Sequence, residues 1–200
     1  MRHILQMNKP ADATIIDQVM AGHKSLFAQL IDRYNAMAFT LAYRILDNRE
    51  DAEEVVQDAF VKAYEHLGDF RQKSKFSTWL YRIVYNTAIS HARIRRPSLQ
   101  EMDDHAFQVP DNNPSDDTVY GFTQDEAGEL VRKMLKILPE EDRTILTLYY
   151  LNESGIDEIH TITGLSKSNI KVKLFRARKK IQECIARVSD AVPLCSLTIQ

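Results

Sequence analysis

Two stretches of the sequence, residues 70–97 and residues 166–182, concentrate positive charge and contain no carboxylate. In the first, aromatic side chains such as Phe70 and Trp79 alternate with lysines and arginines. Rings can stack on unpaired bases while cations follow the phosphate backbone, so this mixture is suited to single-stranded nucleic acid. The second stretch holds seven cations. Both favour contact with a polyanion, although rings such as Phe76 and Trp79 could instead belong to a hydrophobic core.

The sequence lacks the residue patterns that common catalytic sites require. Its six glycines are isolated from one another, so neither a P-loop nor a dinucleotide-binding loop can form. No histidine lies in an H-E-x-x-H motif, no G-x-S-x-G elbow is present, and Cys184 and Cys195 lack metal-ligand spacing. We therefore expect no enzymatic activity, no metal or other cofactor, and no small-molecule substrate.

Length and composition indicate an ordinary globular protein. The chain has 200 residues, of which 44% are hydrophobic and 27% are charged, which suits one domain or two small ones. No apolar run approaches the roughly 20 residues of a membrane-spanning helix, and residues 1–10 do not resemble a signal peptide. The two cysteines cannot build a disulfide framework. These features predict a cytoplasmic protein.

The elements that must position the charged stretches are helices, because apolar residues recur at intervals of three and four and strand-like alternation is almost absent. Four helices are expected in the first half, at residues 12–22, 24–46, 48–68 and 77–95. Asn48 is suited to cap the third of them. Pro97 ends the fourth, because the residue before a proline avoids helical geometry.

Residues 98–122 differ in character from the rest of the chain. They hold six acids, no base and no hydrophobic period. A segment of this length is unusual inside one compact domain, so we expect an acidic flexible linker.

Four further helices are expected after the linker, at residues 124–137, 139–151, 156–163 and 167–188. The second of these would begin with Pro139 at its first helical position, and the third with a capping box formed by Ser154 and Asp157. The predicted fold is therefore all-α. It has two small helical domains, at residues 1–97 and 123–188, joined by the linker and followed by a tail at residues 189–200.

The last two predicted helices are separated by Gly164, Leu165 and Ser166, a short glycine-containing turn that is typical of a helix-turn-helix. Ser166 is placed to cap the final helix. On a helical wheel the inward stripe of this helix is Ile170, Leu174, Ala177 and Ile181, and the outward face is centred on Ser168, Val172, Phe175 and Lys179. Basic and amide side chains on that face suit the major groove. The pattern is also compatible with a basic helix of a small bundle whose Phe175 packs on a neighbour.

The third predicted helix has the opposite charge. Six acids stand between residues 47 and 58, against one arginine, Arg49. Acids near a helix N-terminus are favoured by the helix dipole, so part of this pattern is structural. An outward strip from Glu54 to Lys62 could nevertheless dock a basic partner.

Three runs of residues, in this order, resemble segments of the extracytoplasmic-function (ECF) sigma factors of bacterial RNA polymerase. The run from Asp51 to Phe60 is similar to the helix that docks on the polymerase. Phe70-Arg71 and the run from Phe76 to Asn86 are similar to the segment that recognises the −10 promoter element. Residues between Leu138 and Arg178 are similar to the domain that reads the −35 element. The resemblance covers most of the chain.

The resemblance implies a dissociable subunit that binds core RNA polymerase, on the coiled coil of its largest subunit, and directs promoter-specific transcription initiation. It also implies promoter DNA and an anti-sigma factor as partners. The residues implied for polymerase binding are Asp51, Glu54, Gln57 and Asp58. Those implied for the −10 element are Phe70, Arg71, Ser74, Lys75, Phe76, Trp79, Arg82, Asn86 and Arg93. Those expected at the −35 element are Ser168, Asn169, Lys171, Val172, Lys173, Phe175, Arg176 and Lys179.

Three positions depart from the family pattern. Gln72 stands where a glycine is frequent, Ser90 where an aspartate is frequent, and His160 where a small residue is usual.

Two other functions stay open at this point. A free-standing DNA-binding regulator would use only the helix-turn-helix and would leave the acidic and aromatic helices without a role. An enzyme acting on nucleic acid would need a catalytic group that the sequence does not display.

Overall fold

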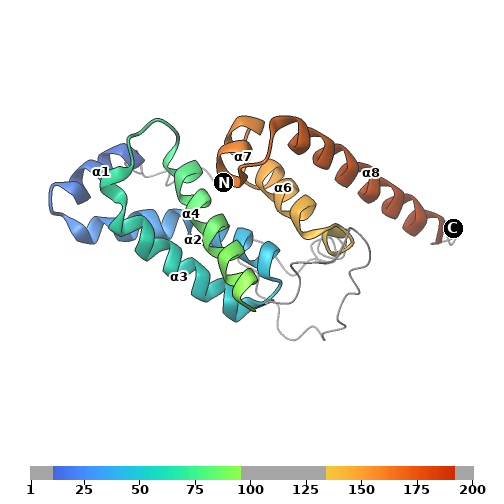
Figure 1. Ribbon diagram of the computed structural model, residues 1–200, viewed down its shortest axis with the longest axis horizontal. Helices are drawn as coiled ribbons and strands as arrows, with labels where there is room; N and C mark the ends of the chain where they lie inside the picture. The colour runs from blue at the N-terminus through green and yellow to red at the C-terminus, as the bar shows by residue number, and fades with distance from the viewer. Residues whose placement is uncertain (1–10, 96–133, 192–200) are drawn as a thin grey trace, which may run out of the picture.

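The protein is a bundle of helices in the computed structural model, which describes residues 11–95 and 134–191 (Figure 1). The N-terminal part contains α1 (Asp12–Met20), the short 3₁₀ helix η1 (Lys24–Leu26), α2 (Phe27–Leu46), α3 (Arg49–Glu65), a second 3₁₀ helix η2 (Leu67–Asp69) and α4 (Phe76–Arg95). The C-terminal part contains α6 (Glu140–Tyr150), α7 (Ile156–Thr163) and α8 (Lys167–Ala191). The described residues contain no strand, and the predicted all-α fold is confirmed.

Capping groups lie at the starts and ends of these helices where the sequence predicts them. The side-chain oxygen of Asn48 accepts a hydrogen bond of 3.0 Å from the backbone N–H of Asp51 and so caps α3. Gly164 ends α7 in the left-handed conformation, with φ 76°, which glycine adopts without steric cost. The hydroxyl of Ser166 then accepts the backbone N–H of Asn169 at the start of α8, at 3.2 Å. The turn of the helix-turn-helix therefore forms as expected.

Two details of the predicted helix starts are wrong. Pro139 is the N-cap of α6 and not its first helical residue. The N-cap of α7 is Gly155, whose backbone N–H donates to the carboxylate of Glu158 at 2.9 Å. The expected box of Ser154 and Asp157 is displaced by one residue, because Ser154 is buried before the helix begins and accepts a hydrogen bond from Asn152 instead.

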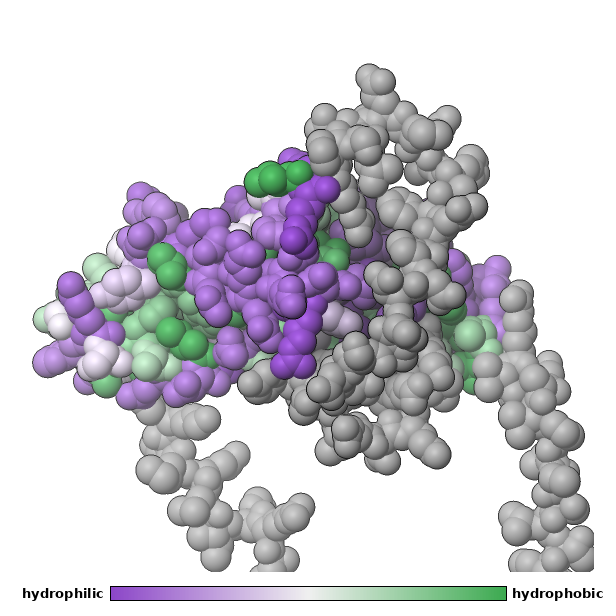
Figure 2. All heavy atoms as spheres, turned by 90° about the horizontal axis from the view of Figure 1, so that it is seen from below, coloured by the Kyte–Doolittle hydropathy of each residue, from purple (hydrophilic) through white to green (hydrophobic). Residues whose placement is uncertain are grey.

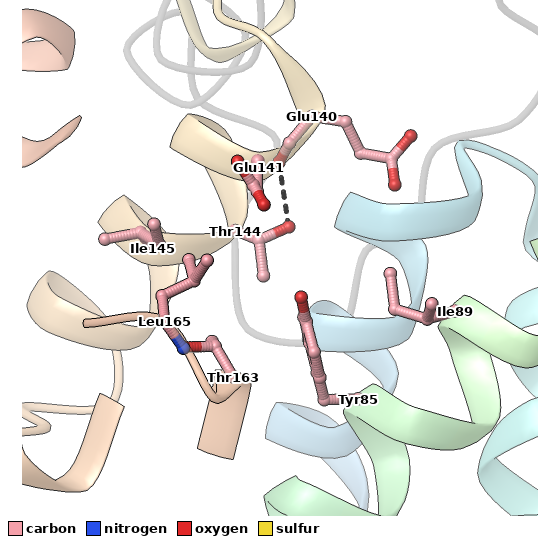
Figure 3. Close-up of a pocket in the computed structure, with 8 residues that line it drawn as sticks. All are labelled: Tyr85, Ile89, Glu140, Glu141, Thr144, Ile145, Thr163 and Leu165. Carbon is pink, nitrogen blue, oxygen red and sulfur yellow. Dashed lines mark hydrogen bonds between the residues drawn. The ribbon is translucent and has the colours of Figure 1, made fainter. Parts of the chain in front are cut away.

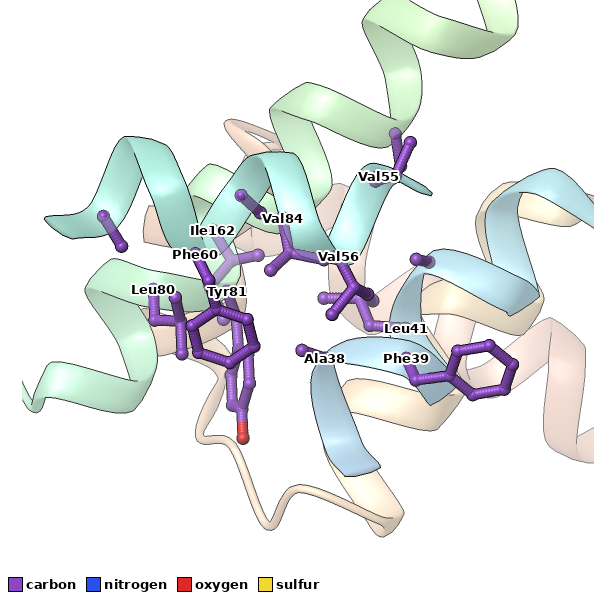
Figure 4. Packing of buried hydrophobic residues seen from close by; sticks show 14 of the residues in the cluster. Ala38, Phe39, Leu41, Val55, Val56, Phe60, Leu80, Tyr81, Val84 and Ile162 are labelled. Atoms are coloured by element: carbon purple, nitrogen blue, oxygen red, sulfur yellow. The ribbon is translucent and has the colours of Figure 1, made fainter. Parts of the chain in front are cut away.

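Helices α2, α3 and α4 pack against one another around a continuous hydrophobic core. Leu41 of α2 and Leu80 and Val84 of α4 are fully buried there. The inward stripe expected for α3 is also buried, and its members are Ala52, Val55, Val56, Ala59, Phe60, Ala63 and, just beyond the helix, Leu67. Figure 4 shows part of this cluster, with side chains from α2, α3 and α4 and with Ile162 of α7 among them. The core therefore extends into the C-terminal part of the chain.

The C-terminal helices pack on α8 and also on the N-terminal domain. Within their own domain, α6 and α7 both contact α8, and Ile170, Leu174 and Ala177 of α8 are buried as predicted. In addition, α7 contacts α4, and α6 contacts α2. The predicted linker at residues 98–122, most of the predicted helix at residues 124–137 and residues 192–200 of the tail lie outside the described residues.

None of the helices in the described ranges combines the length and apolar character that crossing a membrane requires.

The cap of α3 gives a first test of this fold. Replacing Asn48 by alanine removes the acceptor for the Asp51 N–H and should lower the free energy of unfolding by about 1 kcal/mol. Asn48→Asp keeps a side-chain oxygen at the same place and should retain most of that stability. Urea unfolding followed by circular dichroism measures both, and equal losses in the two variants would contradict the capping role.

Candidate nucleic-acid and polymerase interface

The loop before α4 holds an aromatic cluster rather than separate exposed rings. The ring of Phe70 lies 5.6 Å from that of Phe76 and 5.3 Å from that of Trp79, measured between centroids, and Phe76 lies 5.7 Å from Trp79. Phe70 and Trp79 are half-buried, so each keeps part of its ring accessible. This cluster anchors the loop to the first turn of α4. The loop carries the basic residues that lie between Phe70 and Phe76 in the sequence.

The expectation that Phe76 contacts the −10 element is wrong for this conformation. Its side chain is only 2% exposed, and its ring lies 5.5 Å from that of Tyr34 of α2. The reason is helical periodicity, because Phe76, Leu80 and Val84 follow one another at spacings of four residues along one buried face of α4. Phe76 is therefore a core residue that supports Phe70 and Trp79.

The backbone of the loop explains one departure from the family pattern. Gln72 has φ 55°, in the left-handed region that favours glycine. The frequent glycine at this position thus matches a conformational need of the loop. Gln72 meets the same need at some steric cost, and its side chain is exposed.

The polar residues expected to contact DNA lie on the solvent side of the loop and of α4. Arg71 and Ser74 are exposed on the loop. Arg82, Asn86 and Arg93 are exposed on α4, and their spacing of four and seven residues places them on one face. Ser90, the second departure from the family pattern, is exposed as well.

Lys75 differs from these residues because it already has a partner. Its ammonium nitrogen lies 3.0 Å from a carboxylate oxygen of Glu158, which belongs to α7 of the other domain. The hydroxyl of Thr78 donates to the same oxygen at 3.4 Å.

The acidic strip of α3 is exposed, as expected. Glu54, Gln57 and Asp58 all face solvent. The apolar side chain of Val61 is exposed beside them. Seen from below, on the side where α3 lies in Figure 1, the surface is mainly hydrophilic with isolated apolar side chains (Figure 2). A basic partner could reach this strip.

Asp51 does not belong to this exposed strip. It is buried, and both of its carboxylate oxygens bind the guanidinium of Arg95, from the last turn of α4. Its assignment to polymerase binding is corrected, because the carboxylate is used to join the start of α3 to the end of α4.

Asp51, Glu54 and His91 also offer ligand atoms within 4.8 Å of one another. Since Arg95 already neutralises Asp51, we assign no metal ion to this group.

The outward face of α8 presents the side chains that the helix-turn-helix prediction requires. Phe175 is 68% exposed and Val172 is 45% exposed, so neither side chain is buried in the core. This rules out, for the described residues, the alternative in which Phe175 is a core residue. The polar members of this face are also exposed, namely Ser168, Asn169, Lys171, Arg176 and Lys179.

Lys173 is an exception on α8. Its ammonium group lies 2.5 Å from a carboxylate oxygen of Glu141 and 3.2 Å from one of Asp142, both on α6. Partial burial alone would lower its pKa, but the hydrogen bonds to Glu141 and Asp142 outweigh it and raise the pKa of Lys173 above its usual value. The expected −35 contact of Lys173 is corrected accordingly, because this side chain ties α8 to α6.

Contacts of two residues, Arg178 and His160, hold the helix-turn-helix in shape, and the sequence did not reveal them. The Nε of Arg178 donates to the hydroxyl of Tyr150 at 2.8 Å, and its guanidinium lies 5.2 Å from the centre of the Tyr149 ring. Nδ1 of His160 lies 2.7 Å from the backbone oxygen of Leu165. Since a carbonyl can only accept, this nitrogen is the donor, and His160 fastens α7 to the turn. The only sequence signal was its departure from the family pattern.

Comparisons with known proteins decide the family. Sigma-70 region 2 matches residues 30–97, and Sigma-70 region 4 matches residues 128–181. The RNA polymerase sigma-H factor of Pseudomonas aeruginosa is 32% identical over 90% of this chain and 96% of its own length. The ECF sigma factor SigW of Bacillus subtilis is 30% identical over 84% of this chain and 93% of its own length.

The chain belongs to the ECF sigma factors. As a sigma factor it binds core RNA polymerase and directs promoter-specific transcription initiation through recognition of −10 and −35 elements.

Solved structures of sigma factors share the fold. CnrH, solved in complex with the cytosolic domain of CnrY, has a TM-score of 0.62 at 24% identity and covers 89% of this chain and 99% of its own. The sigma factor RpoE of Bartonella quintana, solved with the anti-sigma factor NepR, has a TM-score of 0.63 at 22% identity and covers 80% of this chain and 96% of its own.

The corrected role of Phe76 can be tested by stability. Phe76→Ala should lower the free energy of unfolding by about 3–5 kcal/mol, because it opens a cavity beneath the aromatic cluster. Arg82→Ala, on the exposed side of the same helix, should change it by less than about 0.5 kcal/mol. Urea unfolding compares the two, and a stable Phe76→Ala variant would return this ring to the DNA-contacting set.

Proposed function

We propose that the exposed strip of α3 is the polymerase-docking surface of this sigma factor. Glu54, Gln57 and Asp58 supply two carboxylates and one amide on an exposed face of α3. The Glu54 carboxylate lies 3.8 Å from Nε2 of His91 on α4. The charge of this face suits a basic surface, for which the family resemblance suggests the coiled coil of the largest polymerase subunit. Asp51 has a supporting role, since its pair with Arg95 holds α3 against α4.

The loop before α4 and the exposed face of α4 are the proposed −10-binding surface. Phe70 and Trp79 can offer ring edges or faces to bases removed from the duplex, and Arg71, Arg82 and Arg93 can contact phosphates. Taking a base out of the stack costs a few kcal/mol, which stacking and phosphate contacts offset. The remaining members of this surface are Ser74, Lys75 and Asn86.

The outward face of α8 is the proposed −35-reading surface, and its exposure is the observation that carries this assignment. Helix α8 follows the glycine turn and presents a phenylalanine, 68% exposed, among lysines, an arginine and an asparagine. Such a face suits direct contact with base edges and thymine methyl groups in the major groove.

The remaining expectations follow from the family. The proposed domain boundaries are residues 1–97 and 123–188. We expect no catalytic activity in the chain itself, a cytoplasmic location, and control by an anti-sigma factor. The last point draws support from the two solved relatives, whose structures contain CnrY and NepR as partners.

Base reading by α8 is tested with the full chain in complex with core polymerase, on promoters carrying single substitutions in the −35 element. Arg176→Ala should reduce discrimination at one position by about 1–3 kcal/mol, because a base-edge contact is lost. Lys180→Ala is the control, since a phosphate contact should weaken all promoters alike and reduce the salt dependence by roughly one unit. Uniform weakening by Arg176→Ala would show that Arg176 only contacts phosphate.

Polymerase docking is tested by co-purification with core polymerase. Replacing Gln57 and Asp58 together by alanine should abolish it while helical content stays unchanged, because both side chains face solvent. A change of Asp17, an exposed carboxylate on α1, to alanine serves as the control and should leave binding intact. Run-off transcription by the unmodified chain with core polymerase separates this function from both a free-standing regulator and an enzyme.

A further inference from the structure

His160 is an exposed departure from the family pattern on the first helix of the helix-turn-helix. Its ring stands where a small residue is usual, and it faces solvent in the middle of α7. The neighbouring side chains of Ile159 and Ile162 are buried, so His160 lies on the outer face of this helix. A ring that can change its charge is therefore accessible to a ligand at this position.

The hydrogen bond of His160 determines which ring nitrogen is left for a ligand. Nδ1 carries a proton, because it donates to the backbone oxygen of Leu165 at 2.7 Å. A neutral imidazole has only one N–H, so Nε2 of the neutral ring is an acceptor and repels a phosphate oxygen. Protonation turns Nε2 into a second donor and adds a positive charge, while the bond from Nδ1 to Leu165 is kept.

The acceptor on Leu165 is held in place by packing. The side chain of Leu165 is partly buried against the core, and together with Tyr85 and Ile89 of α4 it lines a small pocket (Figure 3). Its backbone N–H also donates to the hydroxyl of Thr163 at 3.3 Å. The imidazole of His160 is therefore oriented before a ligand binds, because its partner is fixed on both sides.

His160 shares its corner of the helix-turn-helix with one carboxylate and two ammonium groups. Asp157, one turn earlier on α7, pairs with Lys167 at the start of α8, with 2.5 Å between nitrogen and oxygen. The hydrogen bond and the charge of Lys167 lower the pKa of Asp157, and the charges of His160 and Lys171 add to this effect. Since Lys167 already neutralises the carboxylate, Lys171 and a protonated His160 remain to attract an anion.

Charged groups of the other helices that contact α7 have partners of their own. Lys75 of α4 pairs with Glu158, which points away from His160 because two positions along a helix correspond to about 200° of rotation. On α6, Glu141 and Asp142 are neutralised by an ammonium group of α8. The environment that decides the charge of His160 is therefore the corner formed by α7 and the start of α8.

We infer that His160 is a proton-dependent phosphate contact of the −35-reading domain. In a helix-turn-helix the second helix enters the major groove and the first crosses the DNA backbone, and His160 lies on the side of α7 that meets the start of α8. Its protonated Nε2 donates to a phosphate oxygen beside the −35 element. Promoter affinity should therefore fall as the pH rises through the range in which histidine loses its charge, about pH 5 to 8. This inference rests on the proposed −35 role of α8.

The test measures the affinity of the full chain, in complex with core polymerase, for a promoter duplex at about pH 6 and about pH 8. The unmodified chain should lose about 5- to 10-fold more affinity over this range than His160→Ala, because it loses a charge-assisted hydrogen bond to phosphate. At the lower pH its salt dependence should be steeper by roughly one unit. His23→Ala, at an exposed histidine of the N-terminal domain, is the control and should keep the pH profile of the unmodified chain.

A second variant separates the phosphate contact from the structural role of the ring. In His160→Asn the side-chain amide can donate to the Leu165 oxygen from nearly the position of Nδ1, but it has no proton to gain. This variant should keep the thermal stability of the unmodified chain, measured by circular dichroism, and should lose the same pH-dependent affinity as His160→Ala. Equal pH profiles in the unmodified chain and in both variants would overturn the inference and leave His160 with its structural role alone.

The outcomes also separate this inference from the proposed function. Loss of −35 discrimination in Arg176→Ala, together with unchanged pH profiles in the His160 variants, would keep α8 at the −35 element and remove His160 from the DNA. Promoter binding that is unaltered in both Arg176→Ala and His160→Ala, at either pH, would contradict the −35 assignment of α8 and with it this inference.

Discussion

The burial of the apolar faces of α2 and α4 is the constraint on which the rest of the structure depends. Leu41, Leu80 and Val84 have no solvent exposure, and these helices are covered by α3 and by the C-terminal helices α6 and α7. A helix packed on two sides has only one side left for a ligand. That geometry selects Arg82, Asn86 and Arg93 as the solvent-facing members of α4 and removes Phe76 from the same role.

Charge segregation is the second organising feature, and internal ion pairs modify it. The acids of α3 and the cations of α8 would form two continuous charged faces if every side chain were free. Instead Asp51 binds Arg95, Lys75 binds Glu158, and Lys173 binds Glu141 and Asp142. Each pair joins two helices, so these residues contribute to the arrangement of the molecule and leave a smaller set to meet partners.

The helices and their ends were predictable because they depend on neighbours within a few residues. The bounds of α7, Ile156–Thr163, agree with the prediction, and Asn48, Gly164 and Ser166 cap as expected. The outward position of Phe175 followed from the same periodicity. The capping box of α7 was misplaced by one residue because a serine and a glycine stand side by side, and both are common at such positions.

The sequence by itself therefore determined the all-α fold, the helix-turn-helix and the family, since helical periodicity and short motifs are local properties. Only the tertiary structure decided which charged residues are free and how the two domains meet. Asp51 and Arg95 are 44 residues apart, and Thr78 and Glu158 are 80 residues apart. Contacts at such separations depend on how whole helix faces are buried together, and no spacing along the chain records which face a distant helix will cover.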